Sequence, residues 1–191
     1  MAYFTMCIDL KGRTILLVGD GPQTADKMRK LRLFGCELRQ ASQFCPACLT
    51  KDVAFVVVGD TDRAEAARIV GVCREYGIPV NVVDAPELCS FFFPATVIRG
   101  DLTVAVSTAG KAPGAAAFLA GRIGAQLPDR TEEILDWLGE VRQNLYARWP
   151  KDTARQMLSG ITREALERGY PLTDEEIEGL TASGHHGTGN L

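Results

Sequence analysis

Residues Thr14 to Leu31 read TILLVGDGPQTADKMRKL, an apolar strand that passes through a glycine turn directly into a helix. In the nucleotide-binding form of this unit, the first glycine permits a tight turn and the second lets the backbone approach a pyrophosphate. The start of the helix adds free N–H groups and a partial positive charge. Gly19 and Gly21 occupy the two glycine positions, and Thr24 occupies the third small position. The stretch predicts a nucleotide phosphate site, with a plain strand-to-helix connection as the alternative.

Two nearby features leave the nucleotide itself open. Asp20 lies between the glycines, where its carboxylate would be close to a bound diphosphate. An acidic residue at the end of the second strand would hold a ribose 2′-hydroxyl, but that strand, CELRQA, ends in Gln40 and Ala41 with Arg39 beside it. These residues do not select NAD over NADP.

Strands and helices alternate in the first part of the chain, which is typical of a parallel sheet with crossover helices. We expect strands at 14–19, 36–41, 53–58 and 79–83 and helices at 23–34 and 62–76. The runs ATVIRG and LTVAVST flank Gly100-Asp101 and predict an antiparallel hairpin. Helices should follow to about residue 126 and over 130–147, 153–168 and 174–180. The predicted class is α/β, with a Rossmann-like parallel sheet, an antiparallel segment and a C-terminal helical region.

The same pattern predicts a division into parts. We assign 1–112 to the nucleotide-binding domain with its terminal hairpin, the antiparallel segment starting at about 86, then 113–182 to a helical domain and 183–191 to a disordered tail. In the helical part, an apolar face recurs at spacings of three and four, formed by Leu135, Leu138, Val141 and Leu145. That face needs a partner and, together with the hairpin, suggests a homodimer.

Composition excludes several classes of protein. The 191 residues are 24% charged and 46% hydrophobic, which is ordinary for a globular protein, and the net charge of −3 argues against a general nucleic-acid binder. No run reaches the roughly 18 apolar residues of a membrane span. The opening MAYFTMCIDLKG lacks the order of a signal peptide. We therefore expect a cytoplasmic protein with no membrane or nucleic-acid partner.

The cysteines and histidines do not predict a metal site. Cys45 and Cys48 form a single C-P-A-C, for which a redox pair, half of a metal site and a plain loop are the alternatives. The loop is favoured, because a tetrahedral zinc site needs four ligands. His185 and His186 are the only histidines, and an unstructured tail is favoured there over a metal site. Acid–base chemistry in this chain is therefore expected to use other residues.

Asp84 is the first candidate for such chemistry. It ends the strand PVNVVD, and ligands of open parallel sheets bind beyond the carboxyl ends of the strands. The apolar run 91–94, FFFP, would enclose and desolvate its carboxylate. The alternative is an aspartate that caps the next turn. A second segment, Ser107 to Lys111, combines small residues with a lysine before a helix and is either an anion site or an ordinary loop.

Three segments together resemble one family. They are YFTMCIDLKGRTILLVGDG, VNVVDAPELCSFFFPATVIRGDLTVAVSTAGKAP and the helical tail, and they span roughly residues 3–170. The chain resembles the precorrin-2 dehydrogenase/sirohydrochlorin ferrochelatase family, whose members occur alone or as the N-terminal module of siroheme synthase. The resemblance implies an NAD-binding domain, a homodimer built by the antiparallel segment and helices, and an active site between them.

The resemblance also implies a reaction. Precorrin-2 would be oxidised to sirohydrochlorin by hydride transfer to NAD, and bifunctional members then insert ferrous iron to give siroheme. Asp84 matches the family's essential aspartate, which is credited with proton transfer in both steps. A single positioned carboxylate is able to accept a proton from carbon or from a pyrrole nitrogen.

The implied binding residues fall into two groups. The cofactor-binding group is Gly19, Asp20, Gly21, Pro22, Gln23, Thr24, Gln40, Gly59 and Asp60. The substrate-binding group is Asn81, Arg99, Ser107, Thr108, Gly110 and Lys111. Lys27, Arg99 and Lys111 are the candidates to bind the peripheral carboxylates of a tetrapyrrole.

The departures from the family lie in the cofactor half. Family members usually show three successive glycines where this chain has Gly19-Asp20-Gly21, and A-T-D-D where it has Gly59-Asp60-Thr61-Asp62. A carboxylate near a diphosphate opposes NAD binding. Two alternatives follow: a cofactor-deficient member that acts only as a chelatase or tetrapyrrole-binding protein, and a nucleotide-sensing or scaffold domain whose helical tail pairs with another protein.

Overall fold

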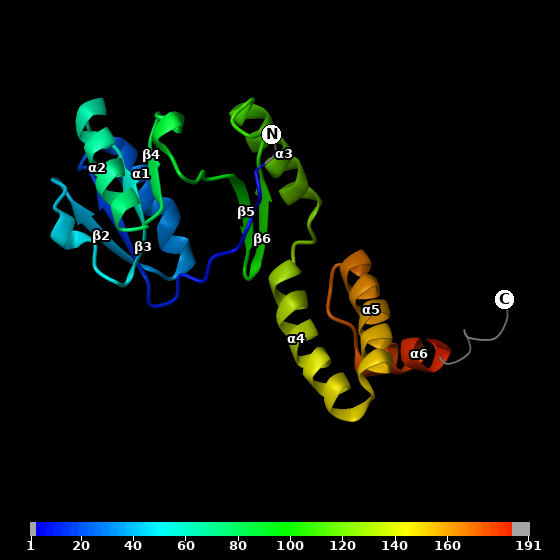
Figure 1. Ribbon diagram of the computed structural model, residues 1–191. Helices are drawn as coiled ribbons and strands as arrows, with labels where there is room; N and C mark the ends of the chain where they lie inside the picture. The colour runs from blue at the N-terminus through cyan, green and yellow to red at the C-terminus, as the bar shows by residue number, and fades with distance from the viewer. Residues whose placement is uncertain (1–2, 185–191) are drawn as a thin grey trace. The chain divides into compact units, whose positions relative to one another are not determined.

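The computed structural model describes residues 3–184 (Figure 1). Contacts divide the described residues into two compact units, one formed by 5–93 and the other by 94–184 with Tyr3 and Phe4. The hairpin groups with the C-terminal helices, whereas the division at residue 112 assigns it to the sheet. That division stays a prediction. The predicted tail at 183–191, with His185 and His186, lies outside the described residues except for 183–184, which end the last helix.

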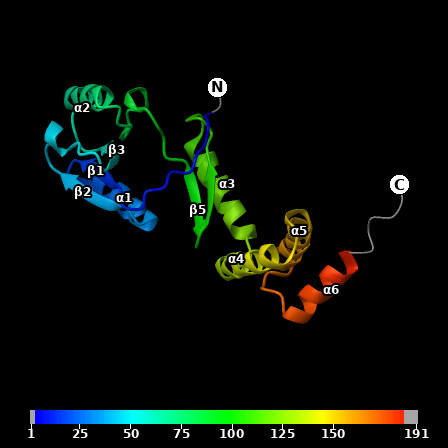
Figure 2. The ribbon, with the colours of Figure 1, turned by 60° about the horizontal axis from the view of Figure 1, so that its bottom comes forward.

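The first unit is built on a four-stranded parallel sheet. Its strands are β1 (Thr14–Val18), β2 (Glu37–Ala41), β3 (Val53–Val58) and β4 (Val80–Val82), in the order β2-β1-β3-β4. Helices α1 (Pro22–Leu31) and α2 (Arg63–Glu75) cover opposite faces of this sheet (Figure 2). This is the Rossmann-like arrangement that the sequence predicts.

Burial on both faces explains the apolar sequences of the central strands. Ile15 of β1 and Val57 of β3 lie in the core that contains Leu31 of α1. The alternate residue Leu16 lies in the core that contains Ile69 of α2. A parallel strand covered on both sides needs apolar residues at every position, which is why β1 and β3 read as continuous runs.

The second unit begins with an antiparallel pair, β5 (Ala95–Arg99) and β6 (Leu102–Val106). The strands turn at Gly100, whose φ is +53°. Helix α3 (Pro113–Gln126) packs on the pair, and a Cβ at Gly124 would lie 3.1 Å from Cγ1 of Val97. Glycine at 124 therefore permits the close approach of helix and strand. Both strands are described in full, and none of their residues is buried.

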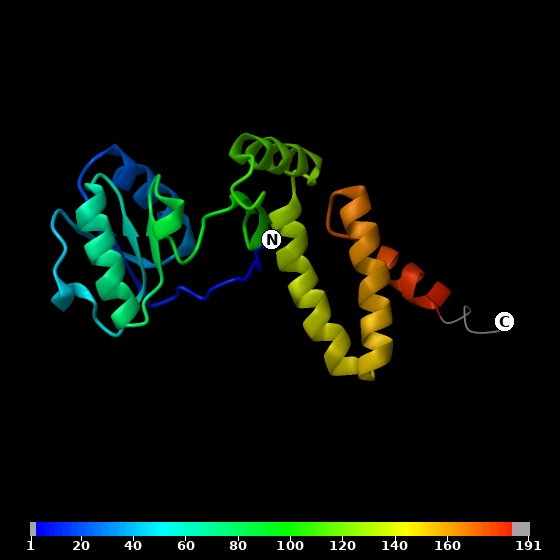
Figure 3. The same ribbon diagram turned by 45° about the horizontal axis from the view of Figure 1, so that its top comes forward.

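Helices α4 (Thr131–Arg148), α5 (Lys151–Arg168) and α6 (Asp174–Gly184) complete the second unit (Figure 3). Their shared core contains Ile134, Leu138, Val141, Leu145, Ala154, Ile161 and Ala165. The apolar face predicted on α4 is confirmed except at its start, where Ile134 is buried and Leu135 only half-buried. Because α5 of the same chain covers this face, the face does not itself point to a homodimer.

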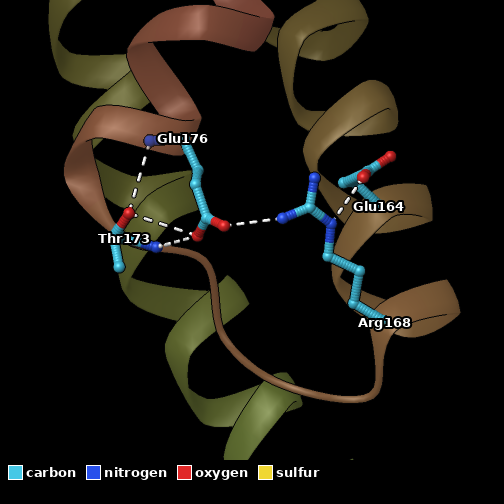
Figure 4. A network of polar contacts seen from close by, with 4 residues as sticks. All are labelled: Glu164, Arg168, Thr173 and Glu176. Carbon is cyan, nitrogen blue, oxygen red and sulfur yellow. Dashed lines mark hydrogen bonds and ion pairs between the residues drawn. The ribbon is translucent and has the colours of Figure 1, made fainter.

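A polar network joins α5 to α6 (Figure 4). The guanidinium of Arg168 contacts carboxylate oxygens of Glu164 and Glu176, each at 2.6 Å. Glu176 also accepts a hydrogen bond from the backbone N–H of Thr173 at 2.8 Å. This backbone donor is the main reason why the pKa of Glu176 is lowered. The network holds the first turn of α6 beside the end of α5.

Element boundaries follow the sequence expectations closely. The strand at 53–58 is confirmed to the residue. The helix expected at 23–34 ends as an α-helix at Leu31 and continues as a 3-10 turn over Arg32–Phe34. The last helix runs to Gly184 rather than ending at 180. No helix in the described part of the chain is long and apolar enough to cross a membrane.

Candidate functional site

The site lies where the chain changes direction across the sheet. From β1 the chain crosses to β2 on one side, and it then returns to β3 on the other, so β1 and β3 form the topological switch point. Gly19 follows β1 and Gly59 follows β3. A Cβ at Gly19 would lie 2.1 Å from the carbonyl oxygen of Gly59, and the φ of Gly19 is +121°. Only glycine fits at this crossing, in agreement with the tight turn predicted for Gly19.

The start of α1 is capped by Asp60, a residue from the other side of the switch point. Its carboxylate accepts hydrogen bonds from the backbone N–H of Thr24 at 2.9 Å and of Gln23 at 3.3 Å. The hydroxyl of Thr24 donates a third bond at 2.8 Å. The N-cap residue itself is Gly21, which has no side chain to offer. These donors hold the pKa of Asp60 below its usual range, with the Thr24 backbone N–H as the largest cause.

The glycines around Asp60 leave room for its side chain. A Cβ at Gly21 would lie 2.5 Å from Cγ of Asp60, so this glycine lets the carboxylate approach the backbone of the turn. Asp60 adopts a φ of +56°, which turns its side chain toward α1. From the sequence, the carboxylate near the phosphate site is expected at Asp20, whereas Asp20 is exposed and Asp60 is the residue bonded to α1.

Gln23 connects the capping loop to Asp84. Its Oε1 accepts a hydrogen bond from the backbone N–H of Asp60 at 3.2 Å, and its Nε2 donates to Oδ2 of Asp84 at 2.7 Å. Asp84 follows β4 with a φ of +60°. The structure therefore brings Gln23, Asp60 and Asp84 together at the carboxyl edge of the sheet. Sequence reasoning named all three but did not foresee these contacts.

The aromatic run packs into the core rather than enclosing Asp84. The rings of Phe91 and Phe93 make edge contacts with Phe55, at centroid distances of 4.9 and 6.1 Å. Asp84 remains exposed. The expected desolvation by the segment 91–94 is thus wrong, because two of its three rings complete the hydrophobic layer beneath α1.

Lys27 is a cationic residue whose charge interacts with that of Asp84. Its Nζ lies 4.6 Å from the centroid of the Phe93 ring, and the side chain is half-buried. Burial lowers the pKa of Lys27, and the nearby charge of Lys30 lowers it further, while Asp26 and Asp84 act in the opposite direction. Lys27 remains a candidate to bind a carboxylate near Asp84.

Other predicted residues of the first unit serve the scaffold. The buried amide of Asn81 donates to the carbonyl oxygen of Phe91 at 3.0 Å. The amide of Gln40 donates to the carbonyl oxygen of Gly19 at 2.9 Å and so fixes the glycine turn. Pro22 is the first residue of α1, where a missing N–H leaves no bond unmade.

The remaining candidates belong to the second unit. Arg99 is exposed at the end of β5. The loop before α3 is held by local bonds, in which Ser107 accepts from the N–H of Ala109 and Thr108 from the N–H of Ala112. Gly110 has a φ of +77°, and Lys111 is exposed. The loop therefore has a defined shape and carries an exposed cationic side chain.

Within residues 3–184, no group of three or more His, Cys, Asp or Glu residues is arranged to hold a metal ion. Cys45 is exposed and Cys48 half-buried at a short 3-10 turn, Pro46–Cys48. Cys89 is also half-buried, and its sulfur accepts from the N–H of Val82 at 3.1 Å. Burial raises the pKa of the Cys89 thiol, which favours a structural role.

Comparison with known proteins identifies relatives of this chain. The family described as "Putative NAD(P)-binding" matches residues 38–95. The siroheme synthase of Stutzerimonas stutzeri is 30% identical over 202 residues, which cover 95% of this chain and 42% of that protein. The siroheme synthase of Ectopseudomonas mendocina is 36% identical over 200 residues, which cover 93% of this chain and 43% of that protein.

A solved structure described as SirC, precorrin-2 dehydrogenase, has the same fold. It superposes with a TM-score of 0.65 at 20% identity, over 96% of this chain and 100% of that one. The likeness confirms the predicted α/β class with its helical region. This chain spans 42–43% of the length of the two siroheme synthases, so those proteins contain further sequence that is not compared.

Proposed function

Because the chain belongs to the precorrin-2 dehydrogenase family, we propose that it oxidises precorrin-2 to sirohydrochlorin with a nicotinamide cofactor, NAD in the first place. The reaction would be a step of siroheme biosynthesis in the cytoplasm. The observation that carries the proposal is the position of Asp84, at the carboxyl end of β4 and bonded to the first turn of α1 through Gln23. A carboxylate there lies beside the crevice in which a dinucleotide binds in this fold.

The backbone of the first unit fits a dinucleotide, with one obstacle. Gly19 and Gly59 meet so closely that neither side of the crossing has room for a Cβ, so no side chain of these two residues stands between the backbone and a diphosphate. The N–H groups of Gln23 and Thr24, however, already bind Asp60. The turn thus fits a cofactor only when this carboxylate has moved.

The proposed chemistry assigns separate tasks to the residues. A bound nicotinamide cofactor supplies the acceptor for the hydride that leaves carbon. Asp84 accepts the proton that must leave carbon in the same oxidation. Gln23 orients Asp84 by its 2.7 Å hydrogen bond. Lys27, whose pKa responds to the charge of Asp84, binds a peripheral carboxylate of the tetrapyrrole.

The direct test follows sirohydrochlorin formation by absorbance, with purified protein, precorrin-2 and either NAD or NADP under anaerobic conditions. Asp84→Asn keeps the size of the side chain and should lower the rate by roughly 100-fold or more. Glu87→Gln, at an exposed acid of the next turn, is the matched control and should keep the rate. The proposal is contradicted if Asp84→Asn converts precorrin-2 at the wild-type rate. It is also contradicted if the wild type converts no precorrin-2 with NAD and none with NADP.

Insertion of ferrous iron into sirohydrochlorin is proposed as a second activity, with Asp84 accepting the pyrrole protons. The carboxylate of Asp60 at α1 favours one variant of the proposal, in which the chain acts only as a chelatase or tetrapyrrole-binding protein. This variant predicts tight binding of sirohydrochlorin without NAD-dependent turnover. A scaffold function predicts instead that Asp84→Asn changes nothing.

A homodimer is proposed as the working assembly. The surface of α3 supports it, because Phe118 and Leu119 are 64% and 46% exposed. The neighbouring strands β5 and β6 form a two-stranded sheet, which is marginal without further cover. Light scattering at micromolar concentration should give twice the chain mass, and a monomer alone would contradict the proposal.

A further inference from the structure

We propose that Asp60 is a built-in competitor for the cofactor phosphate, so that this residue sets the affinity of the chain for its dinucleotide. The inference rests on the proposed nicotinamide site. The fold alone does not assign to Asp60 the role of a competitor for phosphate. Phosphate binds at α1 only after the Asp60 carboxylate has left the N–H groups of Gln23 and Thr24.

The hydrogen bonds at the start of α1 carry the argument. An α-helix begins with N–H groups that have no partner within the helix, and these are the donors that hold phosphate in nucleotide-binding turns. In this chain the N–H of Ala25 already bonds to the carbonyl oxygen of Gly21 at 3.1 Å. The N–H groups before it, those of Gln23 and Thr24, both donate to Asp60. The donors that a phosphate requires are therefore taken.

Space and charge point the same way. The Asp60 carboxylate lies against Gly21, where a Cβ would come within 2.5 Å of its Cγ and Oδ1. This is the position that the second glycine of the turn keeps open for a pyrophosphate. A lowered pKa keeps Asp60 ionised at neutral pH, so the two anions repel each other. Since Asp60 is exposed, its side chain has solvent to move into.

Isothermal calorimetry of the full chain with NAD and with NADP tests the inference. Asp60→Asn removes the charge and keeps the shape, and it should lower the dissociation constant by about tenfold. Asp60→Ala removes both the charge and the shape of the side chain, and it should bind the cofactor at least as tightly as Asp60→Asn does. Glu37→Gln, which removes a carboxylate at the opposite end of the sheet, is the control and should bind like the wild type.

Hydrogen exchange of the ligand-free protein gives a readout that does not depend on any cofactor. Asp60→Ala should speed the exchange of the Gln23 and Thr24 amides, because their acceptor is lost, and unchanged exchange would overturn the inference. Equal dissociation constants for the wild type and both Asp60 variants would overturn it while leaving the proposed function intact. Absence of binding in every variant would overturn both.

Discussion

The two units of the chain differ in how completely they bury their strands. In the first unit, all five residues of β1 are buried, and α1 and α2 cover both faces of the sheet. In the second, no residue of β5 or β6 is buried, and the buried core lies among α4, α5 and α6 instead. A sheet covered on both faces supports a fixed site at its carboxyl edge. A two-stranded sheet with half-exposed side chains is better suited to contact another molecule.

A matched pair of leucine variants would show whether this difference persists in solution. Leu16→Ala, at a fully buried position of β1, should lower the free energy of unfolding by about 2–5 kcal/mol. Leu102→Ala, at a half-buried position of β6, should lower it by less than about 1.5 kcal/mol. Urea denaturation at several protein concentrations measures both. Equal losses would mean that the β5–β6 pair is covered in solution, and the comparison would fail.

A variant of Gln23 sharpens the comparison, because it tests whether the first unit holds Asp60 and Asp84 rigidly at the carboxyl edge of its sheet. Gln23→Leu removes the two side-chain bonds, to the backbone N–H of Asp60 and to the carboxylate of Asp84, at similar volume. We expect kcat for the proposed precorrin-2 oxidation to fall about tenfold with KM nearly unchanged, if the residue positions Asp84 rather than binding substrate. Steady-state kinetics and the pH profile of kcat provide the measurement.

The control for this variant is Gln43→Leu, at an exposed glutamine of the same unit. A rise in KM alone for Gln23→Leu would show that Gln23 contacts substrate. Wild-type kinetics would show that the bond to Asp84 does not matter for the reaction.

Asp52 lies at the opposite edge of the same sheet, and its carboxylate should make the stability of the first unit depend on pH in the acid range. The hydroxyl of Thr14 donates to its carboxylate and is the largest cause of a pKa near 2, lowered from 3.8. Because the folded pKa is depressed, the stabilisation is present above pH 4 and is lost as the pH falls toward 2. Asp52→Asn should therefore flatten the fall in melting temperature over this range. A wild-type slope in Asp52→Asn would assign the acid loss to other carboxylates.

The smallest effect is expected in the second unit, at the network of Figure 4. Arg168→Met removes the contacts to Glu164 and Glu176 but keeps much of the aliphatic stem. These ion pairs are partly exposed, so the melting temperature should fall only slightly, and added salt should reduce the difference. A large, salt-independent fall would show that the network determines the packing of α6.

The sequence was informative where one local rule decides the outcome. Continuous apolar residues predict β1 and β3, and the end of β4 predicts the place of Asp84. Contacts between distant segments were not predictable, because Asp60 and Thr24 are 36 residues apart and meet only once β1 and β3 have paired. The phase of α4 was missed for a related reason: Ile134 and Leu135 are both apolar, and only the packing of α5 selects Ile134.

The positive φ values of Asp60 and Asp84, +56° and +60°, have a consequence for the evolution of stability. Left-handed backbone is strained for residues with a Cβ, less for aspartate than for most, and is unstrained only for glycine. Substitution of Asp84 by glycine should therefore raise the melting temperature while removing the carboxylate. At Asp60 the same substitution would also remove the acceptor that caps α1, so relief of strain and loss of the cap oppose each other there. Selection for thermal stability alone would therefore act differently on the two aspartates, and through the backbone rather than through the buried core.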